Sequence, residues 1–200
     1  KGEVLIDGEK VNIKSPVEAM KYGIGMVHQE FMLIDGYDVA ENIKLNRENV
    51  KKTPLSMIFG KRLNLVDRIS MHKESRATLD SLGIELSERT RVGSLPVGYK
   101  QFVEIARELD KKNIKLIVLD EPTAVLTEKE AEQFLKCVKE VSEKGISFIF
   151  ISHKLDEVRH YTHHTFVLRD GEMVGDYDTN ELSTIKMSEL MVGRKVEILN

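Results

Sequence analysis

The chain has 200 residues, of which 41% are hydrophobic and 32% charged, a composition ordinary for a globular protein with one sizeable core. Its 30 Lys and Arg residues against 33 Asp and Glu residues give a net charge of −3, so no overall positive field attracts nucleic acid or anionic lipid. A single cysteine, Cys137, excludes an internal disulfide, and no apolar run reaches the ~18 residues that a membrane-spanning helix needs. We therefore expect a domain of a reducing compartment that binds no nucleic acid and reaches a membrane only through a partner.

Short strands and one short helix are expected in the first part of the chain. Asp7-Gly8 has the residue types of a tight hairpin turn, and Gly23 suits the end of a helix. The elements expected here are, in chain order, paired strands over residues 4–6 and 10–13, a helix over 16–22 and a strand over 24–27.

Residues 42–110 carry many charges and few β-branched runs, and Gly83 interrupts them. This composition predicts a mostly helical subdomain, with its loosest connection near residues 46–54. One helix of the subdomain is expected to have an apolar face made by Phe102, Ile105, Ala106 and Leu109.

Strands and helices alternate in the second half, which is the pattern of an open parallel α/β sheet. Thr127 and Glu130 form a capping-box pattern at the start of a helix that ends at Gly145 and carries the buried Cys137. The other elements expected are near-continuous apolar strands over 115–119, 147–151 and 165–168, a hairpin turn at Asp170-Gly171 into a strand over 172–174, and a last helix over 185–192 before Gly193.

Two adjacent carboxylates, Asp120 and Glu121, follow the apolar strand directly. Ligands of open α/β folds bind at the carboxyl edge of the sheet, which is where such residues lie. One carboxylate can face a Mg²⁺ ion while its neighbour polarises a water molecule. An ordinary acidic turn has the same dipeptide, so the pair alone is a weak indication.

Together with four other segments in the same order, the pair makes the chain resemble the nucleotide-binding subunits of ABC transporters. The segments are similar to the Q-loop, the signature, the Walker B strand, the D-loop and the switch-histidine segment, at residues 27–30, 95–101, 116–121, 124–127 and 151–154. The resemblance covers nearly the whole chain. It implies an α/β fold of the P-loop NTPase type, with a mostly parallel sheet, a small antiparallel part and a helical subdomain.

The same resemblance describes residues 1–200 as one partial ABC ATPase domain. Residues 1–42 then hold the β-ribbon and the Q-loop, and residues 43–110 hold the helical subdomain that ends in the signature helix. Residues 111–200 hold the core with the Walker B, D-loop and switch-histidine segments.

Four residues are given catalytic or metal-binding roles by the resemblance. Asp120 holds Mg²⁺ through water, Glu121 orients the attacking water, and His153 reaches the γ-phosphate. Gln29 touches both the metal and the attacking water. Taken singly, a histidine at a strand end or a glutamine in a loop more often has a structural role. Four other histidines are expected at the surface: His72, His160, His163 and His164.

Two loops supply the nucleotide contacts that the resemblance implies, at Pro96, Val97, Gly98, Tyr99, Ala124 and Leu126. The first loop enters a helix, whose N-terminal N–H groups and dipole suit an anion, here the ATP held by the opposite protomer. Pro96 stands where the family usually has serine, and Tyr99 where glutamine is common. Because proline offers neither a hydroxyl nor an N–H, closure or hydrolysis at this half-site is expected to be weaker than usual.

Segments at 15–16, 23–31, 120–127 and 191–194 resemble importers of simple sugars and nucleosides, in which two ATPase domains usually share one polypeptide. The resemblance implies ATP and Mg²⁺ as cofactors. It implies transmembrane permease subunits and a second ATPase domain, in the same polypeptide or in a homodimer, as partners. An extracytoplasmic solute-binding protein is then an indirect partner, and the chain lies peripherally at the cytoplasmic face of the cell membrane.

No G-x-x-x-x-G-K-[ST] phosphate loop, the Walker A motif, occurs in these 200 residues. In the family this loop precedes the segment matched by residues 2–4, so we expect the N-terminal portion of the domain to be truncated here. The 200 residues alone are expected to bind ATP poorly and to hydrolyse it negligibly.

Two other functions stay open. Pro96, Tyr99 and the missing phosphate loop favour a non-hydrolysing regulatory domain of the same type. A soluble ABC-type ATPase acting on ribosomes or DNA is the other, and the balanced charge argues against it. The sequence does not identify the transported solute.

Overall fold

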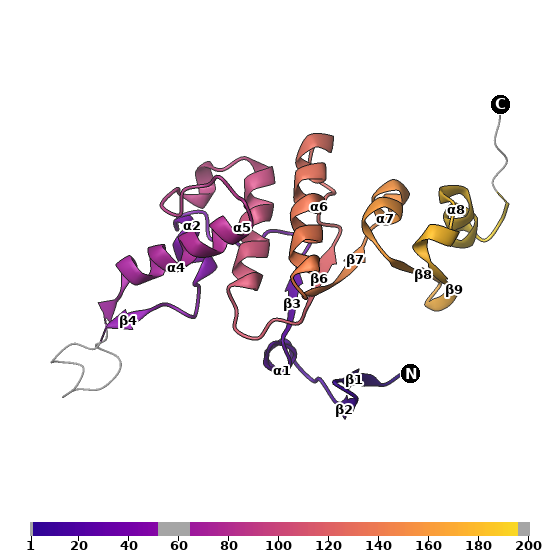
Figure 1. Ribbon diagram of the computed structural model, residues 1–200, viewed down its shortest axis with the longest axis horizontal. Coiled ribbons are helices and arrows are strands. Elements are labelled where there is room, and N and C mark those ends of the chain that lie inside the picture. Colours follow the sequence, from indigo (N-terminus) through magenta and orange to yellow (C-terminus); the bar gives the residue numbers. More distant parts are fainter. Residues whose placement is uncertain (1, 52–64, 196–200) are drawn as a thin grey trace. The chain divides into compact units, whose positions relative to one another are not determined.

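A computed structural model of the chain describes residues 2–51 and 65–195 (Figure 1). The described residues form two compact units, divided between Ile149 and Phe150 within strand β7 (Ser147–Ile151). The described residues contain no helix that is long and apolar enough to cross a membrane.

The predicted N-terminal hairpin is confirmed. Strands β1 (Val4–Ile6) and β2 (Glu9–Val11) pair antiparallel, so the second strand lies slightly earlier than the predicted range of 10–13. Asp7 and Gly8 both have positive φ, 53° and 83°, as the tight turn requires. The predicted helix follows as α1 (Pro16–Lys21).

Three strands make the sheet of the α/β core, in the order β3-β6-β7. Strands β3 (Ile24–Val27) and β6 (Leu116–Asp120) lie side by side (Figure 1). They pair in parallel, with Val27 opposite Leu119. Val27, Ile117 and Leu119 are fully buried, which confirms the apolar character expected of these strands. Strand β6 lies one residue later than predicted, so that Asp120 is its last residue.

Helices dominate the region between β3 and β6, as the composition predicts. Among the described residues they are α2 (Val39–Ile43), α4 (Arg68–Ser81), the 3₁₀ turn η2 (Val92–Ser94) and α5 (Val97–Leu109). Two short strands that the sequence does not predict, β4 (Val50–Lys51) and β5 (Leu65–Val66), pair antiparallel. Part of the predicted loose connection, residues 52–54, lies outside the described residues.

Helix α6 (Glu128–Glu143) begins with the predicted capping box of Thr127 and Glu130. Its buried face packs against α5, where the rings of Phe102 and Phe134 lie 5.7 Å apart. Cys137 is buried in this helix, as expected of a small apolar residue, and burial raises the pKa of its thiol to about 11. The thiol is therefore protonated and unreactive at neutral pH.

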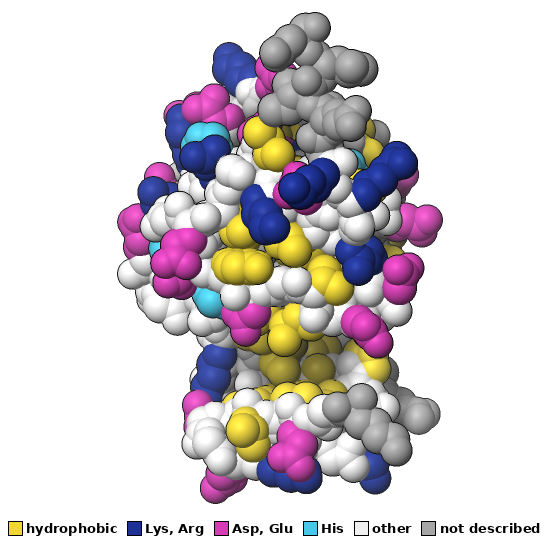
Figure 2. Space-filling view, turned by 90° about the vertical axis from the view of Figure 1, so that its right-hand side faces the viewer, with side chains coloured by type: hydrophobic (Ala, Val, Ile, Leu, Met, Phe, Trp, Pro, Cys, Tyr) yellow, Lys and Arg dark blue, Asp and Glu magenta, His cyan; other side chains and the backbone are white. Residues whose placement is uncertain are grey.

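The second unit is a hairpin with two helices. In chain order it contains α7 (Leu155–Tyr161), β8 (His164–Arg169), β9 (Glu172–Asp178), the 3₁₀ turn η3 (Thr179–Glu181) and α8 (Thr184–Val192). Val158, Leu182 and Met187 form its core. Hydrophobic side chains also reach the molecular surface among charged ones (Figure 2), and on the hairpin they include Phe166, Leu168 and Met173.

The prediction of a surface position is wrong for one histidine. His72, on α4, is only 8% exposed, and its Nε2 lies 3.0 Å from Asp38 Oδ2. Asp38 caps α2 with its other carboxylate oxygen, so the buried imidazole completes a helix cap supplied by a distant segment. The remaining three histidines named above, His160, His163 and His164, are exposed as predicted.

Candidate functional site

The acidic pair lies at the carboxyl end of β6. Asp120 ends the strand and Glu121 follows it, and both side chains are half-buried. Glu121 has a φ of +45°, a left-handed conformation that is uncommon for a residue with a side chain. Its carbonyl accepts a hydrogen bond from the Ala124 N–H at 3.1 Å, which fixes a tight turn directly after the strand. Backbone strain of this kind concentrates at functional sites.

The register of the sheet brings Gln29 to the same edge. Strand β3 ends at Val27, which pairs in parallel with Leu119. Gln29 therefore follows β3 at the level where Glu121 follows Leu119, and it is exposed. Gln29 and the pair Asp120-Glu121 lie far apart in the sequence, but they follow neighbouring strands at the same edge of the sheet.

The predicted signature segment forms the N-terminal end of α5. Pro96 occupies the N-cap position and provides no side-chain cap, although its carbonyl accepts the N–H of Tyr99 at 3.1 Å. Pro96, Val97 and Tyr99 are exposed, whereas Gly98 is buried. The first N–H groups of a helix have no acceptor within it, so this end can offer donors to an anion.

The two predicted nucleotide-binding loops come close together at Gly98. A Cβ atom at this position would collide with the carboxylate of Glu130, the capping-box residue of α6. The second loop leads directly into that cap: Ala124 is exposed, and Leu126, half-buried, donates its N–H to the Thr123 carbonyl at 3.3 Å. The start of α5 and the start of α6 therefore meet, with both loops beside the contact.

His153 belongs to the second unit. It follows the end of β7 by two residues and is exposed. Its place beside Asp120 and Glu121 stays a prediction from the sequence.

The sequence does not predict that two charged residues of α5 are buried. The predicted apolar face is correct for Ile105 and Ala106, which are fully buried, but Glu104 and Glu108 are also buried, with exposures of 1% and 2%. Burial raises the pKa of the Glu104 carboxyl, and the charge of Arg107 offsets this only in part. In the sequence, the burial of Glu104 and Glu108 is indicated only by their spacing of four residues, which puts them on one side of the helix.

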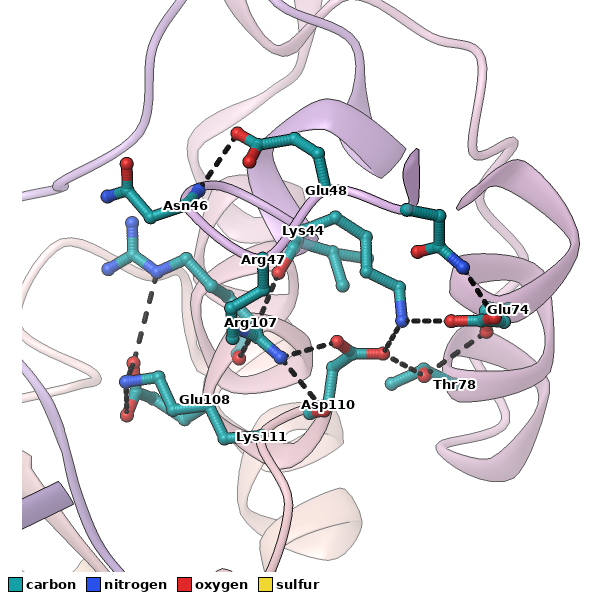
Figure 3. Close-up of polar contacts among 12 residues, drawn as sticks. Lys44, Asn46, Arg47, Glu48, Glu74, Thr78, Arg107, Glu108, Asp110 and Lys111 are labelled. Carbon is teal, nitrogen blue, oxygen red and sulfur yellow. Dashed lines mark hydrogen bonds and ion pairs between the residues drawn. The ribbon is translucent and has the colours of Figure 1, made fainter. Parts of the chain in front are cut away.

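A network of charged side chains holds the C-terminal end of α5 (Figure 3). Asp110 forms ion pairs with Lys44 at 2.8 Å and with Arg47 at 2.7 Å. Lys44 also pairs with Glu74 at 2.6 Å. Arg47 donates further hydrogen bonds to the carbonyls of Arg107 and Asp110, which are in the last turn and C-cap of the helix. Burial alone would lower the pKa of Lys44, but its hydrogen bonds to Asp110 and Glu74 outweigh this and raise it.

The residues at the edge of the sheet fit a magnesium-bound phosphate better than a metal enclosed by protein. Asp120, Glu121 and Gln29 offer carboxylate and amide oxygens, the donor type that Mg²⁺ prefers. Within the described residues, no group of three or more His, Cys, Asp or Glu side chains could hold a metal by itself. Mg²⁺ typically takes one or two protein carboxylates and fills its other positions with water and phosphate oxygens.

Comparisons with known proteins show which family the chain is similar to. Residues 1–124 match the ABC transporter family. The chain is 36% identical over 199 residues to the ribose import ATP-binding protein RbsA of Rhodopirellula baltica, covering 100% of this chain and 37% of that protein. It is 38% identical over 198 residues to the xylose import ATP-binding protein XylG of Photobacterium profundum, covering 99% of this chain and 37% of that protein.

A solved structure shows the same fold. The ADP conformation of MJ1267, an ATP-binding cassette of an ABC transporter, matches with a TM-score of 0.72 and 27% sequence identity, covering 94% of this chain and 72% of that one. The chain spans 37% of the length of the two curated relatives named above. From its sheet, its sequence and its structural likeness, the chain belongs to the ABC transporter family.

Proposed function

We propose that this chain is part of the ATP-hydrolysing subunit of an importer of simple sugars. The observation that carries the proposal is the parallel register of β3 and β6, which brings Gln29, Asp120 and Glu121 to one edge of the sheet. Similar proteins named as import ATP-binding proteins for ribose, xylose and galactose favour a sugar over a nucleoside.

The side chains at this edge divide the work of phosphoryl transfer to water. Mg²⁺, when bound, neutralises charge on the phosphates of ATP. Asp120 would hold the ion through its water shell, and Glu121 would orient and polarise the attacking water. The Gln29 amide would contact the ion and the same water. His153, which belongs to the second unit, is assigned a hydrogen bond to the γ-phosphate on the sequence resemblance alone.

The signature segment serves a second nucleotide. Pro96, Val97, Gly98 and Tyr99, with Ala124 and Leu126 of the neighbouring loop, contact ATP bound by another ATPase domain, in the same polypeptide or in a homodimer. The exposure of Pro96, Val97 and Tyr99 supports this assignment. Because Pro96 offers no hydroxyl and no N–H, this half-site closes less tightly than one with serine.

The partners follow from the import function. Transmembrane permease subunits carry the sugar, an extracytoplasmic solute-binding protein delivers it, and the chain lies peripherally at the cytoplasmic face of the membrane. A net charge of −3 supports a function without nucleic acid.

The 200 residues by themselves lack the phosphate-binding loop G-x-x-x-x-G-K-[ST]. That loop supplies backbone N–H donors, a lysine and a Mg²⁺ ligand. We therefore assign weak ATP binding and negligible hydrolysis to these residues alone.

The test is the substitution Glu121→Gln in the polypeptide as its gene encodes it. Removing the negative charge next to the attacking water should lower ATP hydrolysis by about 100-fold or more, while equilibrium binding of ATP is retained. Glu143→Gln, an exposed change at the end of α6, is the matched control and should leave both unchanged. Full hydrolysis by the Glu121→Gln protein would contradict the proposal.

A non-hydrolysing regulatory domain is the second candidate. It is favoured by the N-cap of α5, where Pro96 provides no side-chain hydrogen bond. In that case the wild-type protein would bind ATP and associate with its second domain, but hydrolyse no faster than the Glu121→Gln protein.

A further inference from the structure

Two buried carboxylates of α5 hold the chain segment that carries Gln29. The Met26 N–H, three residues before Gln29, lies 3.2 Å from Glu108 Oε2. The Met32 N–H, three residues after it, donates to Glu104 Oε1 at 2.6 Å. One helix therefore anchors this segment on both sides of the glutamine.

Arg107 completes the anchor at Met32. Its guanidinium donates to the Met32 carbonyl at 2.7 Å and to Glu104 Oε2 at 2.5 Å. Both polar groups of the Met32 peptide backbone are thus bound by side chains of α5. The arginine side chain is only 13% exposed, so solvent screens these interactions little.

Strand β3 and helix α5 are tightly packed where Glu108 meets the segment before Gln29. A Cβ atom on Gly25 would approach Glu108 Oε2 to 2.5 Å, so strand β3 and α5 are in direct contact there. A buried carboxylate is costly to desolvate, and apolar residues of similar volume often stabilise a fold as well or better. Here the cost is offset because Glu104 and Glu108, one helical turn apart, accept the backbone N–H groups of Met32 and Met26 on either side of Gln29.

We propose that Glu104, together with Arg107, is a positioning residue that fixes the Gln29 segment to α5. The signature segment, residues 95–101, includes the N-terminal turn of the same helix, so Gln29 and the signature segment are joined through one rigid element. The functional part of this inference rests on the proposed function, whereas the anchoring contact itself does not.

Hydrogen exchange tests the anchor in the polypeptide as its gene encodes it. Glu104→Gln keeps the shape of the side chain but places an amide NH₂ against Arg107, so the anchor at Met32 is weakened. Exchange of the Met32 amide should become about tenfold faster or more, since hydrogen bonds to charged groups contribute on that scale. Arg107→Lys, which cannot reach both acceptors, should have the same effect if Glu104→Gln impairs folding.

The matched control is Glu132→Gln, an exposed glutamate of α6 that pairs with Lys136. Its Met32 amide should exchange at the wild-type rate. An unchanged Met32 amide in both anchor variants would overturn the inference, whatever the kinetics show.

A kinetic cycle tests the functional part. Glu104→Gln should lower kcat about tenfold, with little change in KM for ATP, because it misplaces Gln29 without removing nucleotide contacts. If Glu104 acts through Gln29, the double variant with Gln29→Ala is no slower than Gln29→Ala alone. Independent, additive losses would overturn the inference.

A failure of the anchoring inference can be distinguished from a failure of the proposed function. If Gln29→Ala hydrolyses ATP at the wild-type rate, the role of Gln29 in the proposed function is wrong, and the hydrogen-exchange result alone decides whether Glu104 anchors the segment.

Discussion

The two ends of helix α5 are built in opposite ways. At its N-terminal end Pro96, Val97 and Tyr99 are exposed, and Pro96, the N-cap residue, makes no side-chain capping bond. At its C-terminal end the last turn is held by Arg47, and the buried Asp110 pairs with Lys44 (Figure 3).

This difference separates the requirements of folding from those of function. The closed end fixes the helix against α2, α4 and the segment after β3, so its residues are needed for stability and alignment. The open end contributes little to the fold and presents backbone donors to whatever binds there. Substitutions at the two ends should therefore differ both in size and in the property they change.

The largest effect is expected from Asp110→Ala at the closed end. The side chain of Asp110 is only 6% exposed, and its removal leaves Lys44 without one of its partners and Arg47 without its carboxylate. The free energy of unfolding, measured in urea, should fall by about 3–5 kcal/mol. Asp80→Ala, at an exposed pair with Arg76, should cost less than about 1 kcal/mol. Equal losses in the two variants would remove the contrast between a closed and an open end.

A smaller effect is expected from Gly98→Ala, where the open end meets α6. The added methyl group displaces the Glu130 carboxylate from its capping box with Thr127, which should cost about 1 kcal/mol. In a Glu130→Ala background the same change should cost much less, because the collision is gone. A penalty that is the same in both backgrounds would show that Glu130 is not what restricts this position.

The pH dependence of stability sharpens the description of the anchor. Burial raises the pKa of Glu104 above its ordinary value of 4.5, so the folded state favours the protonated form. The contribution of this group to stability is therefore complete below pH 4.5 and is lost as the pH rises through the folded-state pKa. The stability of the wild-type protein relative to Glu104→Gln should fall over that range in urea titrations. A difference that rises with pH would mean that Arg107 outweighs burial.

The smallest effect is expected from Pro96→Ser. Serine can cap the helix, which stabilises it, but the unfolded chain loses the restriction that proline imposes, so the two contributions oppose each other. The free energy of unfolding should change by less than about 0.5 kcal/mol. A loss above about 2 kcal/mol would show that the open end is structural after all.

Local signals in the sequence predict much of this fold. The Asp7-Gly8 turn, the capping box at Thr127 and the apolar strand before Asp120 all lie where residue type and spacing indicate them. Helix α7 is not predicted. Unlike the similarly short α1, which has the Ser15 cap and Pro16 at its start, α7 begins after Lys154, which makes no side-chain capping bond.

Features that depend on distant partners are not predictable in this way. His72 and Glu104 have the residue types of surface positions, and they are buried because segments far along the chain supply Asp38 and Met32 as partners. The acidic pair is visible in the sequence, but the level at which Gln29 leaves the sheet depends on the register of β3 and β6, which the local pattern of either strand does not reveal.

The most direct test of the account is a crystal structure of the Glu121→Gln polypeptide, as its gene encodes it, with Mg²⁺ and ATP. The account predicts the metal and the γ-phosphate at the carboxyl ends of β3 and β6, within reach of Asp120 and Gln29. Nucleotide and metal bound elsewhere, with this edge of the sheet empty, would contradict it.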